Sequence, residues 1–171
     1  MSTTSLDMSD KRFDYISNRI ADSYPDSCIL WIDEVTNDDL FVRYTLKKNE
    51  MENLYPNEME ELQLFHGTNE DNIPLIVEEG FKSHLNKRSA YGKGNYFAKN
   101  ANYSKSYMTS ENKITFMFLC DVLVGRKITP GTKTVLEPCQ CFVSSDTIYV
   151  IPEDDAVYPR YVIAFHKNPP K

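Results

Sequence analysis

The feature of this sequence that most limits its fold is the apolar run ITFMFLCDVLVG at residues 114–125. The run is rich in β-branched and aromatic side chains, which favour a strand. Its apolar side chains follow one another with little alternation, which is typical of a strand buried within a sheet. We therefore expect a central strand here. No run in the chain approaches the roughly 20 apolar residues that a membrane helix needs.

Periodicity and turn residues divide the rest of the chain into further helices and strands. Phe13, Ile16 and Ile20 recur at helical spacing. Residues 69–81 open with Asn and Asp, carry Pro in the first turn and have Gly just past the end, as helices do. We expect helices at 11–24, 39–53 and 69–81, and strands at 28–35, 62–67, 142–151 and 160–167. Residues 1–10 are rich in Ser, Thr and Asp and are expected to be disordered. The fold class is α+β, with strands concentrated in the C-terminal half.

Length and charge limit the possible functions. A chain of 171 residues suits one domain, and at this size it buries roughly two thirds of its unfolded surface without a disulfide or a metal. The net charge of −6 argues against a nucleic-acid binder that uses a broad basic face, but it leaves a local basic pocket open.

The cysteines predict neither a disulfide framework nor a zinc site. They are Cys28, Cys120, Cys139 and Cys141, and only the last two are close, as C-Q-C. This spacing is neither C-x-x-C nor that of a zinc finger, so we expect free thiols in a reducing compartment. The N-terminus is polar and acidic, without an apolar signal segment. We therefore expect a soluble intracellular protein, cytoplasmic or nuclear, without a metal site.

His66-Gly67-Thr68 is a first candidate for a functional segment. A histidine at the end of a strand is exposed where strand geometry stops, and a following glycine lets a ligand approach the backbone closely. A lone histidine is also often a plain structural residue. The motif by itself leaves both interpretations open.

The stretch YGKGNYFAKNANYSKSY at residues 91–107 is a second candidate. It holds two of the six glycines and four of the eleven tyrosines in the chain. Its G-K-G matches neither the dinucleotide-binding fingerprint nor the phosphate-binding loop. A glycine-rich bend followed by an aromatic core strand would explain it. However, a buried tyrosine hydroxyl needs a hydrogen-bond partner, so several tyrosines beside serines also suggest the wall of a polar aromatic pocket.

Several motifs together resemble a known family. They are LFHGT at 64–68, GF at 80–81, YGKGNYFA at 91–98, NYSKSY at 102–107, VLVG at 122–125 and YPRYVIAF at 158–165. In this order and spacing they resemble the catalytic domain of the diphtheria-toxin-like poly(ADP-ribose) polymerases, and most closely its mono-ADP-ribosylating branch. The resemblance extends from about Trp31 to the C-terminus. It implies that residues 11–171 form a single ADP-ribosyltransferase domain, with two small, mostly antiparallel sheets around an NAD cleft and flanking helices.

The resemblance also implies a role for the tyrosines. NAD, the co-substrate, would place its nicotinamide between Tyr96 and Tyr107, where stacking and cation–π attraction contribute roughly 0.5–2 kcal/mol each. The hydroxyl of Ser104 and the backbone of Gly67 would bind the carboxamide. His66 would bind the adenosine-side ribose and orient the dinucleotide.

Further residues would complete the NAD site. Thr68 extends the binding segment after the histidine, and Tyr91, Gly92 and Gly94 would shape the entrance of the clamp. Lys93 has a weaker claim to a role in the site, because an exposed, solvated side chain explains it.

The basic loop after residue 81 matches the donor loop of the family. Lys82, Lys87 and Arg88 would neutralise the diphosphate of NAD there. An ordinary exposed basic loop explains the same residues.

The third catalytic position departs from the polymerising members, which carry a glutamate at the start of a late strand. Here the motif reads His66, Tyr96 and Ile148. We expect Asp146 to lie on the same strand face as Ile148, but two strand residues span roughly 7 Å, too far for a substitute. A carboxylate would stabilise the oxocarbenium-like cation and activate a second ribose hydroxyl, and isoleucine does neither.

The resulting prediction is a mono-ADP-ribosyltransferase that modifies side chains of an acceptor protein or its own side chains. The acceptor would be a carboxylate or a thiolate, and no metal, membrane or nucleic acid is expected to take part. One alternative is an inactive member of the family that acts as a binding module. The other alternative is transfer to nucleic-acid ends, but the acidic net charge argues against it.

Overall fold

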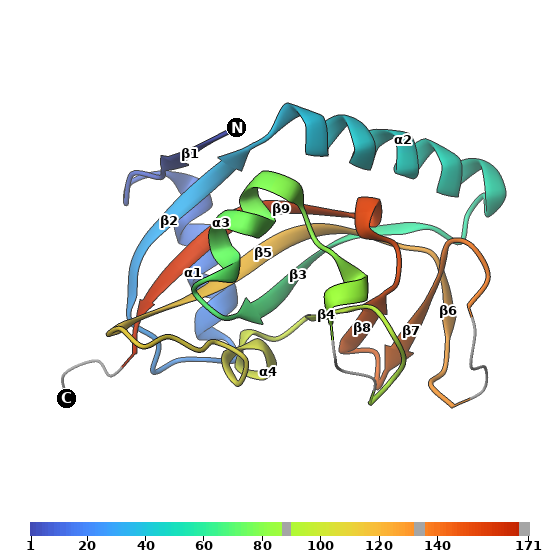
Figure 1. The fold of residues 1–171 in the computed structure, drawn as a ribbon. Coiled ribbons are helices and arrows are strands. Elements are labelled where there is room, and N and C mark those ends of the chain that lie inside the picture. The colour runs from blue at the N-terminus through green and yellow to red at the C-terminus, as the bar shows by residue number, and fades with distance from the viewer. Residues whose placement is uncertain (87–89, 132–135, 168–171) are drawn as a thin grey trace.

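The computed structural model describes residues 1–86, 90–131 and 136–167 and shows a mixed α/β fold built on one sheet (Figure 1). Helices in this part of the chain are α1 (Lys11–Ala21), α2 (Asp38–Leu54), α3 (Asn72–Glu79), α4 (Ala101–Lys105) and the 3₁₀ helices η1 (Ser83–Leu85) and η2 (Asp154–Ala156). Strands are β1 (Ser2–Ser5), β2 (Ile29–Thr36), β3 (Glu60–Thr68), β4 (Asn95–Ala98), β5 (Ile114–Val124), β6 (Arg126–Ile128), β7 (Gln140–Ser144), β8 (Ile148–Ile151) and β9 (Val157–His166).

The sheet is mostly antiparallel, as expected. Its strand order is β1-β2-β9-β5-β3-β4-β8-β7-β6, and neighbouring strands pair antiparallel except for β6 and β7. The apolar run is the central strand β5, paired with β3 on one side and β9 on the other. The prediction of a central strand is confirmed.

Helices cover both faces of the sheet around β5. Side chains alternate between the two faces of a strand, and Phe118 packs in one core cluster with residues of α2 and α3. Its neighbours Met117 and Leu119 pack in a second cluster with Ile16 and Ile20 of α1. Figure 1 accordingly shows α1 behind the sheet and α3 in front of it. The hydrophobic faces predicted for these helices are thus buried on opposite sides of one sheet.

Polar caps fix the ends of α2 and α3. The side chain of Asn37 accepts a hydrogen bond from the Leu40 N–H at 3.2 Å, which caps α2. Its Nδ2 donates to the carbonyls of Val77 and Glu78, each at 3.0 Å, and so ties α2 to the last turn of α3. Gly80 ends α3 with a φ of 81°, which favours glycine.

None of the helices in the described ranges is both long and apolar enough to cross a bilayer.

The N-terminus differs from the expectation of disorder over residues 1–10. Ser2–Ser5 form the edge strand β1, which pairs antiparallel with β2. The four residues are exposed, and Leu6 just after them is buried. Backbone hydrogen bonds to the edge of β2 order this segment, and composition carries no sign of them.

The expectation of two sheets is wrong, because β3 and β4 join the two halves into one. They do so through a single residue pair, Phe65 with Ala98. On one side of this seam lie β1, β2, β9, β5 and β3, and on the other lie β4, β8, β7 and β6. The two halves expected from the sequence are therefore present as parts of one sheet that is narrowly connected.

The segment 142–151 was expected to be one strand and is two. Strands β7 and β8 are separated by a turn in which Ser145 and Asp146 have φ values of 53° and 52°. Asp146 therefore lies in a turn, and not on a strand face shared with Ile148. Its carboxylate lies 3.1 Å from Nζ of Lys99.

The cysteines are free thiols in the structure. Cys28 is half-buried, and the other three are buried. Burial raises the pKa of Cys139 to about 11 and that of Cys141 to about 12. Both thiols are therefore protonated at neutral pH and are poor nucleophiles.

Candidate functional site

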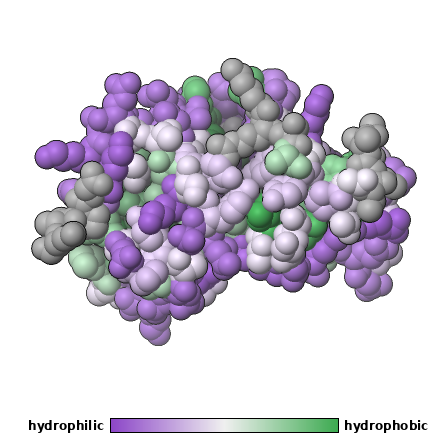
Figure 2. Space-filling view, turned by 90° about the horizontal axis from the view of Figure 1, so that it is seen from below, coloured by the Kyte–Doolittle hydropathy of each residue, from purple (hydrophilic) through white to green (hydrophobic). Residues whose placement is uncertain are grey.

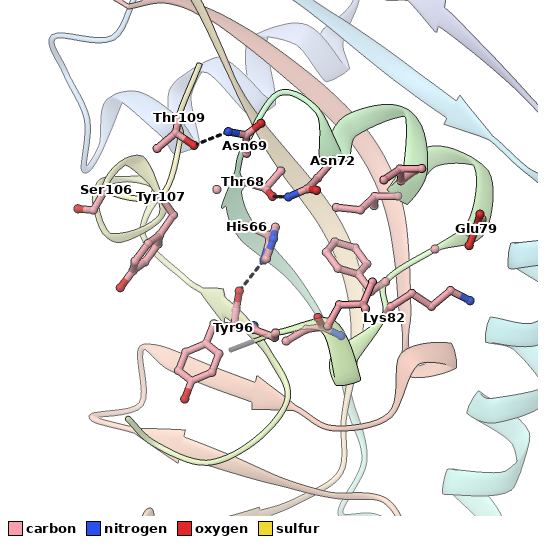
Figure 3. A pocket seen from close by; sticks show the side chains of 18 residues that line it. His66, Thr68, Asn69, Asn72, Glu79, Lys82, Tyr96, Ser106, Tyr107 and Thr109 are labelled. Carbon is pink, nitrogen blue, oxygen red and sulfur yellow. Dashed lines mark hydrogen bonds between the residues drawn. The ribbon is translucent and has the colours of Figure 1, made fainter. Parts of the chain in front are cut away.

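A pocket of about 480 Å³ opens beside the seam between β3 and β4 (Figure 3). The residues that line it come from the segments 66–69, 72–86, 95–96 and 106–109. Figure 3 shows His66 in the middle of the pocket, Tyr96 and Tyr107 to one side, and Glu79 and Lys82 toward the other. Segments far apart in the sequence thus meet at the place where the two halves of the sheet diverge.

His66 is held by both a hydrogen bond and aromatic packing. Its Nδ1 lies 2.7 Å from the carbonyl oxygen of Tyr96. A carbonyl only accepts, so Nδ1 carries the proton, and Nε2 of the neutral ring is an acceptor. The ring packs edge-on against Phe81, with centroids 4.9 Å apart, and lies 5.3 Å from the ring of Phe97. The orientation and the tautomer of His66 are therefore set by its neighbours.

Gly67 is required by the close approach of α4. A Cβ at this position would lie 1.8 Å from the backbone oxygen of Ser104, a distance no side chain can tolerate. Ser104 itself is buried, and its Oγ donates to the carbonyl of Phe65 at 3.1 Å. It is not among the described residues that line the pocket, whereas Ser106 is. Contact between Ser104 and a ligand stays a prediction.

The hydroxyl of Tyr96 is anchored within the protein. It donates to the carbonyl of Gly92 at 2.7 Å and accepts from the N–H of Tyr91 at 3.0 Å. The side chain is buried, yet the residue lines the pocket. Tyr96 therefore joins the pocket wall to the turn before β4.

Tyr107 forms another part of the wall, after α4. It contacts Tyr103 edge-on with ring centroids 5.3 Å apart. Burial, and then a hydrogen bond with Tyr107, raise the pKa of Tyr103 above its usual value, so it stays a neutral phenol. In Figure 3 the side chains of Tyr96 and Tyr107 project to the same side of the pocket. The face-to-face clamp that the sequence suggests stays a prediction.

The glycines of the G-K-G motif have structural reasons of their own. Gly92 has a φ of 121°, and a Cβ there would lie 2.3 Å from the ring of Phe142. Gly94 has a φ of 151°, and a Cβ would lie 2.7 Å from the carbonyl oxygen of Ile151. Tyr91 packs against an apolar cluster formed by Tyr96, Phe142 and Val150, and it is not among the described pocket-lining residues. Lys93 between the glycines is exposed.

Ile148 lies on the same sheet face as Tyr96, in an apolar setting. On β8 it pairs with Ala98, and Val150 pairs with Tyr96. Ile148 packs against the cluster of Tyr96, Phe142 and Val150, outside the lining described above. Seen from below, hydrophobic side chains gather in a recess on the side of β4 and β8, within a mostly polar surface (Figure 2). The hydrogen bond and charge of Lys99 lower the pKa of Asp146, which is therefore ionised but directed to solvent in its turn.

The basic loop is only partly described. Lys82 lines the pocket, whereas Lys87 and Arg88 lie outside the described residues. Among the residues that the structure describes, no three His, Cys, Asp or Glu side chains are grouped so as to hold a metal ion.

Sequence reasoning missed the polar residues that follow the His-Gly-Thr motif. Thr68 was predicted, but its partner Asn72 was not, and Nδ2 of Asn72 donates to Oγ1 of Thr68 at 2.9 Å. Nδ2 of Asn69 donates to Oγ1 of Thr109 at 3.0 Å, which links β3 to the loop after α4. The available signal was the run TNEDN directly after the glycine, which was assigned to the start of a helix.

Comparison with known proteins identifies the family. The model of the poly(ADP-ribose) polymerase catalytic domain matches residues 14–135. Protein mono-ADP-ribosyltransferase PARP12 of Mus musculus is 30% identical over 175 aligned residues, which cover 94% of this chain and 25% of the relative. Protein mono-ADP-ribosyltransferase PARP14 of Homo sapiens is 33% identical over 172 aligned residues, which cover 88% of this chain and 10% of the relative. A probable poly(ADP-ribose) polymerase of Dictyostelium discoideum is 31% identical over 120 aligned residues, which cover 63% of this chain and 34% of the relative.

The chain thus spans from a tenth to about a third of the length of these relatives. The family model covers most of the chain and includes His66, Tyr96 and Tyr107. This chain belongs to the family of poly(ADP-ribose) polymerase catalytic domains.

Proposed function

We propose that this chain is an NAD-dependent protein mono-ADP-ribosyltransferase. It would move one ADP-ribose unit from NAD to a protein side chain and release nicotinamide. The observation that carries the proposal is that an isoleucine, Ile148, packs with Tyr96 and Val150. By its motif, this residue matches the position at which polymerising members carry a glutamate. The names of the PARP12 and PARP14 relatives, both mono-ADP-ribosyltransferases, support it.

The pocket fits NAD in size and chemistry. Its volume of about 480 Å³ lies within the range of roughly 300–1,000 Å³ that small-molecule sites occupy. Tyr96 and Tyr107 offer aromatic faces to a flat cationic ring at one side. His66 and Thr68 are polar groups in the middle, and Lys82 toward the other side can meet the diphosphate. Arg88 would add a second positive charge.

His66 and its neighbours orient the substrate in this proposal. With Nδ1–H donated to Tyr96, Nε2 accepts a hydrogen bond from a ribose hydroxyl. The backbone of Gly67 binds the carboxamide. The Ser104 hydroxyl joins it by rotating away from the Phe65 carbonyl. The anchored Tyr96 and Tyr91 keep the turn before β4 in place during binding.

The identity of residue 148 limits the reaction to one transfer. NAD supplies the ADP-ribose and the nicotinamide leaving group. Breaking the bond between them develops positive charge on the ribose, as in glycoside hydrolysis. The alkyl side chain of Ile148 can neither stabilise that charge nor take a proton from the hydroxyl of a second ribose. An acceptor carboxylate or thiolate provides both the stabilising charge and the nucleophile, and it is consumed in the transfer.

Intact mass spectrometry after incubation with NAD tests the proposal. We expect single ADP-ribose increments on the protein or on an added acceptor protein, together with release of nicotinamide. NAD binding without any transfer would instead favour an inactive binding module. Labelling of a phosphorylated oligonucleotide in place of protein would favour transfer to nucleic-acid ends.

A further inference from the structure

The carboxylate of Asp154, which lies between β8 and β9, holds part of the pocket wall. Oδ1 of Asp154 accepts a hydrogen bond from the backbone N–H of Ser83 at 2.6 Å. The same oxygen accepts from Nδ2 of Asn95 at 3.4 Å. Asp154 begins η2, the connection between β8 and β9, so it is distant in sequence from both donors. Asn95 is buried at the start of β4 and lines the pocket.

A second anchor fixes the other end of the same loop. Nδ2 of Asn86 donates to the carbonyl of Gly94 at 3.0 Å. The loop between these anchors holds η1, a single turn of 3₁₀ helix, and so short a helix has little stability of its own. Lys82, Leu85 and Asn86 of this loop line the pocket, although Leu85 is 67% exposed. The conformation of this wall therefore depends on the anchors.

We propose that Asp154 is a positioning residue that holds the loop Lys82–Asn86 as the wall of the pocket on the side away from Tyr107 (Figure 3). The inference rests on the proposed function. If the two tyrosines take nicotinamide, the loop faces the ADP-ribose part of NAD. A charged acceptor gives stronger hydrogen bonds than a neutral one, which suits a carboxylate that holds two donors from separate segments.

The next residue on η2 supplies a matched control. The carboxylate of Asp155 lies 3.1 Å from Nη1 of Arg43 on α2, and both side chains are about 40% exposed. Nη2 of Arg43 also donates to the carbonyl of Glu79 at 3.2 Å, at the end of α3, but neither Arg43 nor Asp155 takes part in the hydrogen bonds that hold Ser83, Asn86 and Asn95. Asp155→Ala therefore removes a carboxylate from the same 3₁₀ helix without releasing Ser83 or Asn95. Asp154→Asn is the conservative variant, because its amide oxygen can still accept both hydrogen bonds.

The first measurement compares two ligands by calorimetry on the full chain. We expect Asp154→Ala to weaken ADP-ribose binding by about tenfold, the order expected from loss of a charged hydrogen bond. Binding of benzamide, which represents the nicotinamide end alone, should stay within error of the unmodified protein. Asp154→Asn should restore most of the ADP-ribose affinity, and Asp155→Ala should change neither ligand. A general loss of structure would weaken both ligands and would not be rescued by asparagine.

The second measurement needs no ligand. Hydrogen exchange of the backbone amides from Ser83 to Asn86 should be faster in Asp154→Ala than in Asp155→Ala. Exchange of the amides in β5 should be the same in both variants. Failure of the unmodified protein to bind either ligand would refute the proposed function, and exchange at Ser83 would still decide whether Asp154 holds the loop. Unchanged ADP-ribose affinity, an equal loss of both ligands, or unchanged exchange at Ser83 in Asp154→Ala would each overturn the inference.

Discussion

The Nδ1 atom of His66 lies 2.7 Å from the carbonyl oxygen of Tyr96, across the seam where the two halves of the sheet meet. Backbone pairing between β3 and β4 is limited to Phe65 with Ala98. The His66 side chain therefore supplies a hydrogen bond at a point where the strands have already diverged. The divergence opens the pocket, and the same hydrogen bond orients the histidine within it.

Replacing His66 with alanine should abolish ADP-ribose transfer and also lower stability slightly. The transfer is lost because the proposed ribose contact disappears. The Tyr96 carbonyl loses its donor as well, at a cost of about 1 kcal/mol in the free energy of unfolding. Intact mass with NAD and urea unfolding measure the two effects. His166→Ala, at the end of β9 and outside the described pocket lining, is the control and should leave the transfer unchanged. Transfer that persists in His66→Ala would exclude the proposed role.

Replacing Tyr107 with alanine should weaken NAD binding by roughly 1–3 kcal/mol, the range for loss of one aromatic stacking partner. Tyr107→Phe keeps the ring and should retain most of the affinity. Calorimetry with NAD gives the comparison. Tyr15 on α1 is 52% exposed, and Tyr15→Ala is the control for loss of a surface tyrosine. Unchanged affinity in Tyr107→Ala would remove this residue from the clamp.

Replacing Tyr96 with phenylalanine should separate its ring from its hydroxyl. The ring remains for stacking, but the Gly92 carbonyl loses its donor and the Tyr91 N–H loses its acceptor. Two lost hydrogen bonds should lower the free energy of unfolding by about 1–3 kcal/mol. Benzamide affinity should be largely kept. If urea unfolding shows no loss of stability, the hydroxyl does not anchor the turn.

Replacing Gly67 with alanine should be strongly destabilising. The added Cβ would meet the Ser104 backbone oxygen at 1.8 Å, so α4 must move away from β3 at a cost of about 3 kcal/mol or more. Gly131→Ala is the matched control, because its Cβ would have nothing within 4 Å. It carries only the strain of a φ of 85°, about 1 kcal/mol. Equal melting temperatures for the two variants would contradict the packing account.

Replacing Ile148 with glutamate should not create a polymerase. The new carboxylate must stand beside Tyr96 and Phe142 in an apolar cluster, and a second ADP-ribose must also find room as an acceptor. We expect no chain elongation and increased NAD hydrolysis, because the carboxylate stabilises the developing cation. Ile148→Gln introduces a side chain of the same size as glutamate but without its charge, and it should not raise NAD hydrolysis. Polymer ladders from the unmodified protein on a gel would show that residue 148 does not hold the third position.

The sequence alone determined the elements whose signals are local. The long, mostly apolar run predicted β5, and helical spacing with Asn, Pro and Gly punctuation predicted α1 to α3. Motif order identified His66, Gly67, Thr68, Tyr96 and Tyr107, which the structure places around one pocket. These predictions succeed because burial periodicity and backbone punctuation act over a few residues and leave a direct trace in the order of residues.

Only the tertiary structure decided how the segments meet. It joined the two expected sheets at Phe65 and Ala98, ordered β1 on the edge of β2 and directed Ser104 toward Phe65. It also brought Asp154 to Ser83, although nothing in either local sequence indicates the other. Each of these features is a hydrogen bond or a close approach between groups distant along the chain. Such contacts depend on how the packed elements are placed in space, so local patterns of residue type cannot reveal them.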